Sequence, residues 1–185
     1  MNWNELWKFI HQVLLGMLTT PTQGAGITKP LGSGYDKEAD DNLKRSRIVT
    51  FLRAQLHDTY QFGVEVKIGE ESNVWDCSEL MEHVYNRVGL LYPDGCVYQQ
   101  QLISHRRVTN PKPGDVFFYG PNANGIRHTG AYVGNDMVIH AAGRPINQVI
   151  ECSRFVIEAN PRFQGWFRHP DLSLPPQDRY EKSQA

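Results

Sequence analysis

The sequence lacks a strong net charge, a long apolar run and a regular cysteine pattern. Its 19 Lys and Arg nearly offset 20 Asp and Glu, for a formal net charge of −1, so no nucleic-acid partner and no general attraction to an anionic membrane are expected. Three cysteines without C-x-x-C spacing indicate neither a disulfide framework nor a compact zinc site. We therefore expect free thiols, and partners must be inferred from local sites.

Residues 3–18 predict a helix with a single apolar stripe. The stripe consists of Trp3, Leu6, Trp7, Ile10, Val13, Leu14, Met17 and Leu18. The segment is too short and too polar to be a transmembrane span, and Glu5 and the polar pair His11-Gln12 are atypical of a secretory signal. Two interpretations stay open: the helix packs on its own domain, or residues 1–18 dock on a protein partner or membrane surface, with the two Trp as anchors.

The rest of the chain divides by composition into a linker, a domain and a tail. Residues 19–36 are rich in Gly, Pro and Thr, which is typical of a linker. Residues 37–170 have the length and apolar content of one ordinary domain. Residues 171–185 are polar and contain Pro, so a solvated tail is expected.

Within the domain, helical patterns come first and strand patterns follow. Apolar residues spaced by three and four predict a helix from Asp36 to about His57 and another over 78–88, with a shorter helix over 97–103. Runs of β-branched and aromatic residues between turn-forming clusters predict antiparallel strands; these runs are 116–119, 129–133, 137–141, 149–152 and 163–168. Helices followed by a strand meander indicate an α+β fold.

Cys77 lies at the predicted start of the helix over 78–88. Unpaired backbone N–H groups and the positive end of the helix dipole favour a thiolate at such a position, and the thiolate is the nucleophilic form of cysteine. The competing interpretation is a buried structural cysteine, since free Cys is among the most buried residue types. Packing accounts for the other two cysteines, Cys96 after a turn and Cys152 in a predicted strand.

Two histidines flank a predicted hairpin loop. If Gly134-Asn135-Asp136 forms a three-residue loop, Val133 faces Met137 and Gly130 faces His140. His128 then lies on the same face as His140, because side chains alternate along a strand. A two-residue loop would shift the register by one and place the two imidazoles on opposite faces.

Three interpretations of Cys77, His128 and His140 follow from their residue types. A three-ligand zinc site is one, although no close ligand pair and no acidic fourth ligand are present, so no metal or cofactor is expected. Structural histidines are the second. In the third, His128 acts as a base toward Cys77, and His140 hydrogen-bonds the far nitrogen of His128 and sets its tautomer.

The motifs together resemble one known family. They are Asp76-Cys77-Ser78, then Lys112-Pro113-Gly114-Asp115-Val116-Phe117-Phe118, then His128-Thr129-Gly130-Ala131-Tyr132-Val133-Gly134-Asn135, then Met137-Val138-Ile139-His140-Ala141. Their residues, order and spacing are similar to those of the NlpC family of papain-like cell-wall cysteine endopeptidases. The resemblance runs from about residue 47 to about residue 168. The resemblance implies a papain-like fold and hydrolysis of a peptide bond in peptidoglycan stem peptides.

Site residues carried over from the resemblance fall into two groups. The match implies that Cys77 is the nucleophile, His128 the base and His140 the third, polarising residue. A second match implies substrate-binding residues, namely Tyr60, Asp76 and Ser78. The backbone N–H of Cys77, at a helix start, suits an oxyanion donor.

This chain departs from the family pattern at three places, each of which bears on substrate selectivity. Glu79 stands where a small residue is usual. The tyrosine turn, residues 60–64, lacks its second glycine, and residues 121–125 form a loop able to reshape the groove.

A bacteriophage origin would explain how the protein reaches the cell wall without a typical secretory signal. The resemblance implies action at the wall, while residues 3–18 favour docking over secretion, so we expect a tail-associated lysin in the virion or an endolysin in the host cytoplasm. Two other functions stay open: a non-catalytic structural or binding module of a phage tail, and an acyltransferase or thioesterase that uses the same three residues.

Overall fold

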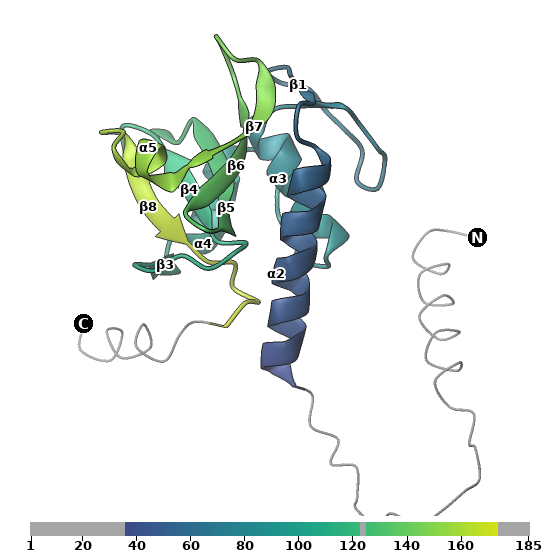
Figure 1. Ribbon diagram of the computed structural model, residues 1–185, viewed down its shortest axis with the longest axis vertical. Coiled ribbons are helices and arrows are strands. Elements are labelled where there is room, and N and C mark those ends of the chain that lie inside the picture. Colours follow the sequence, from purple (N-terminus) through teal and green to yellow (C-terminus); the bar gives the residue numbers. More distant parts are fainter. Residues whose placement is uncertain (1–35, 123–124, 174–185) are drawn as a thin grey trace, which may run out of the picture. The chain divides into compact units, whose positions relative to one another are not determined.

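The computed structural model describes residues 36–122 and 125–173 (Figure 1). The helix expected over 3–18, nearly all of the linker and residues 174–185 of the tail lie outside the described residues. Among the described residues, no helix has the length and apolar character needed to cross a membrane.

Eight strands form one mixed sheet with the spatial order β2-β1-β7-β6-β5-β4-β8-β3. In chain order the elements are α2 (Lys37–Ala54), β1 (Thr59–Tyr60), β2 (Val74–Trp75), α3 (Cys77–Arg87), α4 (Cys96–Ile103), β3 (Arg107–Val108), β4 (Val116–Tyr119), β5 (His128–Gly134), β6 (Met137–Ala142), β7 (Gln148–Ser153), α5 (Arg154–Glu158) and β8 (Phe163–Phe167). Among the strands of residues 36–122 and 125–173, only β1 and β2 pair in parallel. The predicted α+β class is confirmed.

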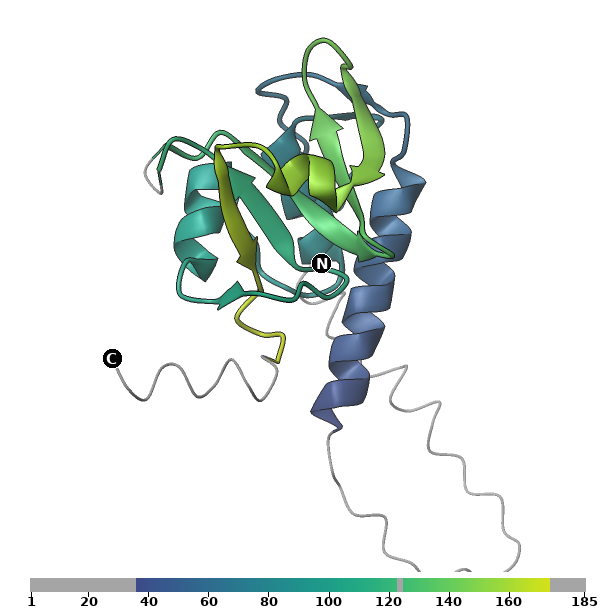
Figure 2. The ribbon, with the colours of Figure 1, turned by 60° about the vertical axis from the view of Figure 1, so that its left-hand side comes forward.

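Both faces of the sheet are covered. On one face, α3 packs against β5 and β6, and α2 packs beside α3 (Figures 1 and 2). The larger core lies there and includes Ile48 and Leu52 of α2 and Leu80 of α3, all fully buried. A smaller core on the other face joins Phe117, Ile157 and Trp166. The sheet is therefore a rigid support for side chains at its strand ends.

α3 begins at a well-capped N-terminus. The Asp76 side chain accepts a hydrogen bond from the backbone N–H of Glu79 at 2.8 Å, which satisfies one of the helix's unpaired donors. The helix is buried along most of its first two turns, including Cys77 and Leu80. Burial on this scale anchors the first turn, so Cys77 is held at a defined position.

The β5–β6 hairpin has a shorter loop than predicted, yet it places His128 and His140 on the same face of the sheet, as predicted. The loop has two residues, Asn135 and Asp136, with φ of 52° and 57°, which suits Asn and Asp in a tight hairpin turn. A register shift between Tyr132 and Gly134 adds one residue to β5 and compensates for the shorter loop. The predicted three-residue loop is therefore wrong, while the predicted shared face of His128 and His140 is confirmed by their contact.

A buried ion cluster joins the start of β4 to the end of β8. Asp115 accepts hydrogen bonds from Nε and Nη2 of Arg168 at 2.8 and 2.6 Å, and Nη1 of Arg45 on α2 lies 3.2 Å away. All three side chains are buried. Paired and hydrogen-bonded charges of this kind tolerate burial, so the cluster fixes the turn at residues 112–115.

The folded part extends beyond the predicted domain end at residue 170. Leu172 is fully buried, and the backbone N–H of Ser173 donates to Asp41 of α2 at 2.8 Å. The ammonium of Lys37 also binds the carbonyl of Asp171. Residues 171–173 thus belong to the domain rather than to a solvated tail.

Candidate active site

Cys77 is the first residue of α3 and is only 7% exposed. Its Sγ lies 4.0 Å from the carbonyl oxygen of Arg127, and the backbone N–H of Thr129 also hydrogen-bonds the sulfur. These two contacts come from the residues on either side of His128. The thiol is therefore placed at the beginning of β5, against the main chain that carries this histidine.

The two histidines are hydrogen-bonded to each other. Nε2 of His128 lies 2.8 Å from Nδ1 of His140, and their ring planes are at 78° with centroids 4.9 Å apart. Phe117 packs against both rings. Nε2 is the ring nitrogen of His128 farther from the main chain, and Nδ1 is the one nearer to the main chain that Cys77 contacts on either side of this residue.

Gly130 makes the space for this pair. A Cβ at this position would lie 2.6 Å from Cβ of His140 and 2.7 Å from Cε1 of Phe117. Real Cβ atoms do not approach other atoms so closely. Glycine is therefore needed beneath the imidazoles because of close packing, and not because of its backbone angles.

Both imidazoles are neutral near pH 7. Burial, followed by repulsion from His140, lowers the pKa of His128 to about 3. Burial lowers the pKa of His140 to about 4. A neutral imidazole can accept a proton from a thiol, which is the state that a general base requires.

Cys77 is a protonated thiol and not the thiolate that its place at a helix start led us to expect. A hydrogen bond with the side chain of Cys96, and then burial, raise its pKa well above the ordinary value, and these effects outweigh the helix N-terminus. Cys96 begins α4, and its Sγ lies 3.6 Å from the carbonyl oxygen of Ile126. In the free protein the nucleophile candidate is therefore a neutral thiol. Nothing in the sequence pattern links Cys96 to Cys77.

Tyr60, at the end of β1, lies next to Cys77. Burial and then the negative charge of an ionised Cys77 raise the pKa of the Tyr60 phenol. The structure thus brings Tyr60 close to Cys77.

Asp76 and Ser78 are engaged within the chain. Oδ1 of Asp76 accepts hydrogen bonds from the backbone of Glu79 and from Oγ of Ser78 at 3.0 Å, and Oδ2 accepts one from the backbone of Gly63 at 3.2 Å. Both side chains are buried. Asp76 therefore caps α3 and ties the loop after β1 to it.

Glu79 is a buried acid in the first turn of α3. It is 3% exposed, and its Oε1 accepts a hydrogen bond from the backbone N–H of Val66 at 2.8 Å. Burial raises the pKa of its carboxyl to about 7. The residue that departs from the family pattern thus holds the loop 61–73 against α3.

Metal-binding geometry occurs elsewhere in the described part of the chain. There, Glu65, Glu79 and Asp94 form the group of three whose ligand atoms lie within 4.8 Å of one another. His128 and His140 instead direct facing nitrogens at each other, and those nitrogens are not free to share a metal with Cys77. The geometry supports the base-and-orienter interpretation over a zinc site.

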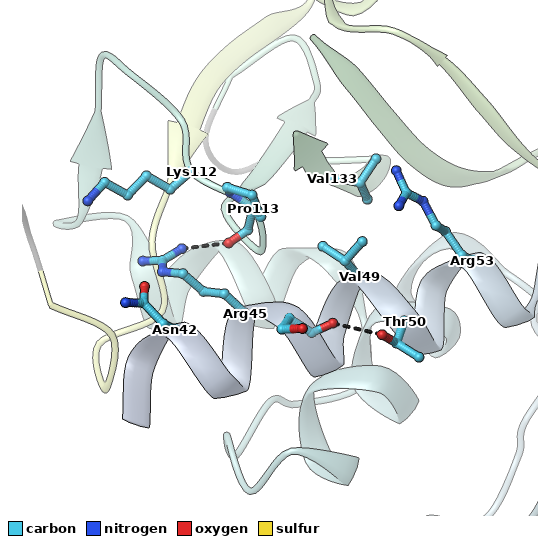
Figure 3. Close-up of a pocket in the computed structure, with 9 residues that line it drawn as sticks. Asn42, Arg45, Val49, Thr50, Arg53, Lys112, Pro113 and Val133 are labelled. Carbon is cyan, nitrogen blue, oxygen red and sulfur yellow. Dashed lines mark hydrogen bonds between the residues drawn. The ribbon is translucent and has the colours of Figure 1, made fainter. Parts of the chain in front are cut away.

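A groove of about 450 Å³ lies between α2 and the turn before β4 (Figure 3). Arg45 crosses it to donate to the carbonyl of Pro113 at 2.7 Å. Val133 lines the groove from β5, five residues beyond His128, or roughly 17 Å along an extended strand. This groove is therefore separate from the cluster around Cys77.

The chain resembles known cell-wall enzymes in sequence. The pattern of the NlpC/P60 family matches residues 58–169. Peptidoglycan endopeptidase RipB of Mycobacterium tuberculosis is 33% identical over 78 residues, which are 42% of this chain and 32% of that protein. Probable endopeptidase p60 of Listeria monocytogenes is 29% identical over 94 residues, 51% of this chain and 18% of that protein. The chain thus spans about a third or less of these relatives.

Solved structures share the fold. The structure of RipB from Mycobacterium tuberculosis has a TM-score of 0.61 at 22% identity, covering 88% of this chain and 79% of that chain. The P60 domain of antigen MAP1204 from M. avium subspecies paratuberculosis has a TM-score of 0.57 at 21% identity, covering 72% of this chain and 98% of that chain.

Proposed function

The chain belongs to the NlpC/P60 family, and we propose that it is a cysteine endopeptidase that hydrolyses a peptide bond in peptidoglycan stem peptides. The observation that supports this most strongly is the 2.8 Å contact between His128 and His140, beside a thiol at the start of a buried helix. A nucleophile, a base and a group that orients the base are the parts that thiol-dependent acyl transfer needs.

The mechanism follows from the placement of these groups. Nδ1 of His128 takes the proton of the Cys77 thiol as the sulfur attacks the scissile carbonyl carbon. The backbone N–H of Cys77, at the start of α3, stabilises the resulting oxyanion. The C–N bond then breaks, and the leaving amine takes the proton from His128, which leaves a thioester on Cys77.

A water molecule completes the cycle. His128 removes a proton from this water as its oxygen attacks the thioester carbonyl. The C–S bond breaks, the acid product leaves, and the sulfur recovers a proton from His128. Throughout, His140 accepts a hydrogen bond from Nε2 of His128 and stabilises the imidazolium that forms in each half-reaction.

Substrate contacts are proposed on the side of the loop after β1. Tyr60 lines the site beside Cys77, as its electrostatic coupling to the thiol supports. Asp76 and Ser78 are proposed to face the free amino end of a stem peptide. Their internal hydrogen bonds suggest that Asp76 acts mainly through its charge and by holding the loop.

Delivery to the wall is a separate proposal. The apolar stripe of residues 3–18, with its two Trp, supports docking of residues 1–18 on a protein such as a phage tail component. The enzyme would then act at the cell wall from the virion or from the host cytoplasm. A chain without residues 1–18 is expected to cleave soluble stem peptides while losing the partner. Cleavage lost together with solubility would instead indicate that the segment packs on its own domain.

The test of the hydrolase proposal is cleavage of purified peptidoglycan, with new amino ends identified by mass spectrometry. The wild type is expected to release them, and Cys77→Ala and His128→Ala are expected to lose cleavage by several orders of magnitude. His105→Ala is the matched control, because His105 is exposed. An inactive wild type, or equal cleavage by Cys77→Ala, contradicts the proposal. Acyl transfer to an added amine without hydrolysis would indicate an acyltransferase.

A further inference from the structure

Cys152 lies against the outer nitrogen of His140. Its Sγ is 3.6 Å from Nε2 of His140, while the other nitrogen of that ring faces His128. In the β6–β7 register His140 pairs with Ile150 and Val138 with Cys152, so Cys152 is a diagonal neighbour on the same face of the sheet. Side chains from β5, β6 and β7 thus form one row, His128, His140 and Cys152.

The order of donors and acceptors along this row decides whether the base can act. A neutral imidazole has one N–H and one acceptor nitrogen. To take the thiol proton on Nδ1, His128 must carry its hydrogen on Nε2 and donate it to Nδ1 of His140. His140 must then carry its own hydrogen on Nε2, which faces Cys152.

The other tautomer of His140 is unproductive. With hydrogen on Nδ1, His140 donates to Nε2 of His128, and neutral His128 carries its hydrogen on Nδ1, where the thiol proton has to arrive. A group that accepts the Nε2–H of His140 therefore favours the active arrangement. Such control of one histidine nitrogen by the partner of the other is a general property of imidazole sites.

We propose that Cys152 is a positioning residue for the reaction, with its sulfur accepting the Nε2–H of His140 and thereby selecting the productive tautomer of both rings. The inference rests on the proposed hydrolase function. The titratable neighbours of Cys152 are Glu151 and Tyr119, in addition to His140. Burial, followed by the charge of Glu151, raises the pKa of the Cys152 thiol, so the sulfur is neutral near pH 7.

The kinetic test compares Cys152→Ala, Cys152→Ser and Glu151→Gln on a soluble stem peptide. Removing one hydrogen bond of modest strength is expected to lower kcat of Cys152→Ala by about threefold to tenfold, with KM little changed. The acid limb of its pH profile, where His128 becomes protonated, is expected to move to lower pH, because the His128 imidazolium loses support from the row. Cys152→Ser keeps an acceptor and is expected to restore both values. Glu151→Gln, one residue away on the opposite face, is expected to match the wild type.

A second readout does not depend on turnover. In a protein with ¹⁵N-labelled histidine, the nitrogen shifts of His140 are expected to indicate hydrogen on Nε2 in the wild type and a mixture of tautomers in Cys152→Ala. If the wild type cleaves no stem peptide, the hydrolase proposal fails while this measurement still tests Cys152. An unchanged tautomer in folded Cys152→Ala, or an unchanged kcat and pH limb, overturns the role given to Cys152.

Discussion

Replacement of Gly130 by alanine tests whether the histidine pair depends on close packing. The new Cβ would lie 2.6 Å from Cβ of His140, whereas ordinary Cβ contacts begin at 3.4 Å, so about 3.4 − 2.6 = 0.8 Å of displacement is required. The other near neighbours are Cε1 of Phe117 at 2.7 Å and the carbonyl oxygen of Ile139 at 2.8 Å. Neither can rotate away, because Phe117 is fully buried and the carbonyl belongs to a paired strand.

Two effects with different signatures are expected in Gly130→Ala. Forced overpacking costs about 1–3 kcal/mol of unfolding free energy. A shift of nearly 1 Å in His140 also misaligns the 2.8 Å contact with His128, and misplacement on that scale is expected to lower kcat by roughly 10- to 100-fold. The unfolding free energy is measured by urea titration, and kcat by hydrolysis of a soluble stem peptide under conditions where the variant is folded.

Gly89→Ala is the matched control. Gly89 follows α3 with a φ of 76° and no atom within 4 Å of a Cβ there. Alanine in this left-handed conformation costs about 1 kcal/mol or more without contacting the histidines. A similar loss of stability with wild-type kcat is therefore expected. Wild-type kcat in folded Gly130→Ala, or an equal loss of kcat in Gly89→Ala, would refute the packing explanation.

Three other perturbations have expected outcomes. Asp115→Asn leaves two buried guanidinium groups short of a counter-charge and is expected to lower the unfolding free energy by about 3–5 kcal/mol in urea titrations; a loss under 1 kcal/mol would contradict this. Because the folded pKa of His140 is about 4, below its unfolded value of about 6.5, its contribution to stability is present above pH 6.5 and is lost as the pH falls toward 4. The loss at pH 5 is about 2 kcal/mol, and His140→Gln should flatten that part of the stability profile. Burial raises the pKa of Glu79 to about 7, so its carboxylate destabilises the fold increasingly as the pH rises from 4.5 to 7. Glu79→Gln should therefore stabilise the protein at pH 8. An unchanged thermal unfolding temperature at that pH would argue against burial as the cause.

Local sequence patterns predicted the main elements that carry the site. Apolar residues spaced by three and four placed a helix directly after Cys77, and the structure has α3 from Cys77 to Arg87. Alternation of side chains placed His128 and His140 on one face, as their contact confirms. These predictions succeeded because period and turn chemistry are properties of neighbouring residues.

Features that depend on distant contacts were not predictable. The register shift in β5 leaves no mark in the hydrophobic pattern, so the loop length was wrong although the face was right. Strands β1, β2 and β3 have two residues each, too few to show a period. The contacts of Cys96 with Cys77 and of Cys152 with His140 join separate elements, and spacing along the chain carries no information on them.

Residues 171–173 contact the start of α2, and this contact affects how such a domain can be joined to other domains. Lys37 binds the carbonyl of Asp171, and Asp41 binds Ser173, so the chain enters and leaves the folded unit at one place. Domains with adjacent ends tolerate insertion into a host loop and circular permutation. This domain is therefore suited to transfer between larger proteins, provided that the cut falls after residue 173 and leaves these contacts intact.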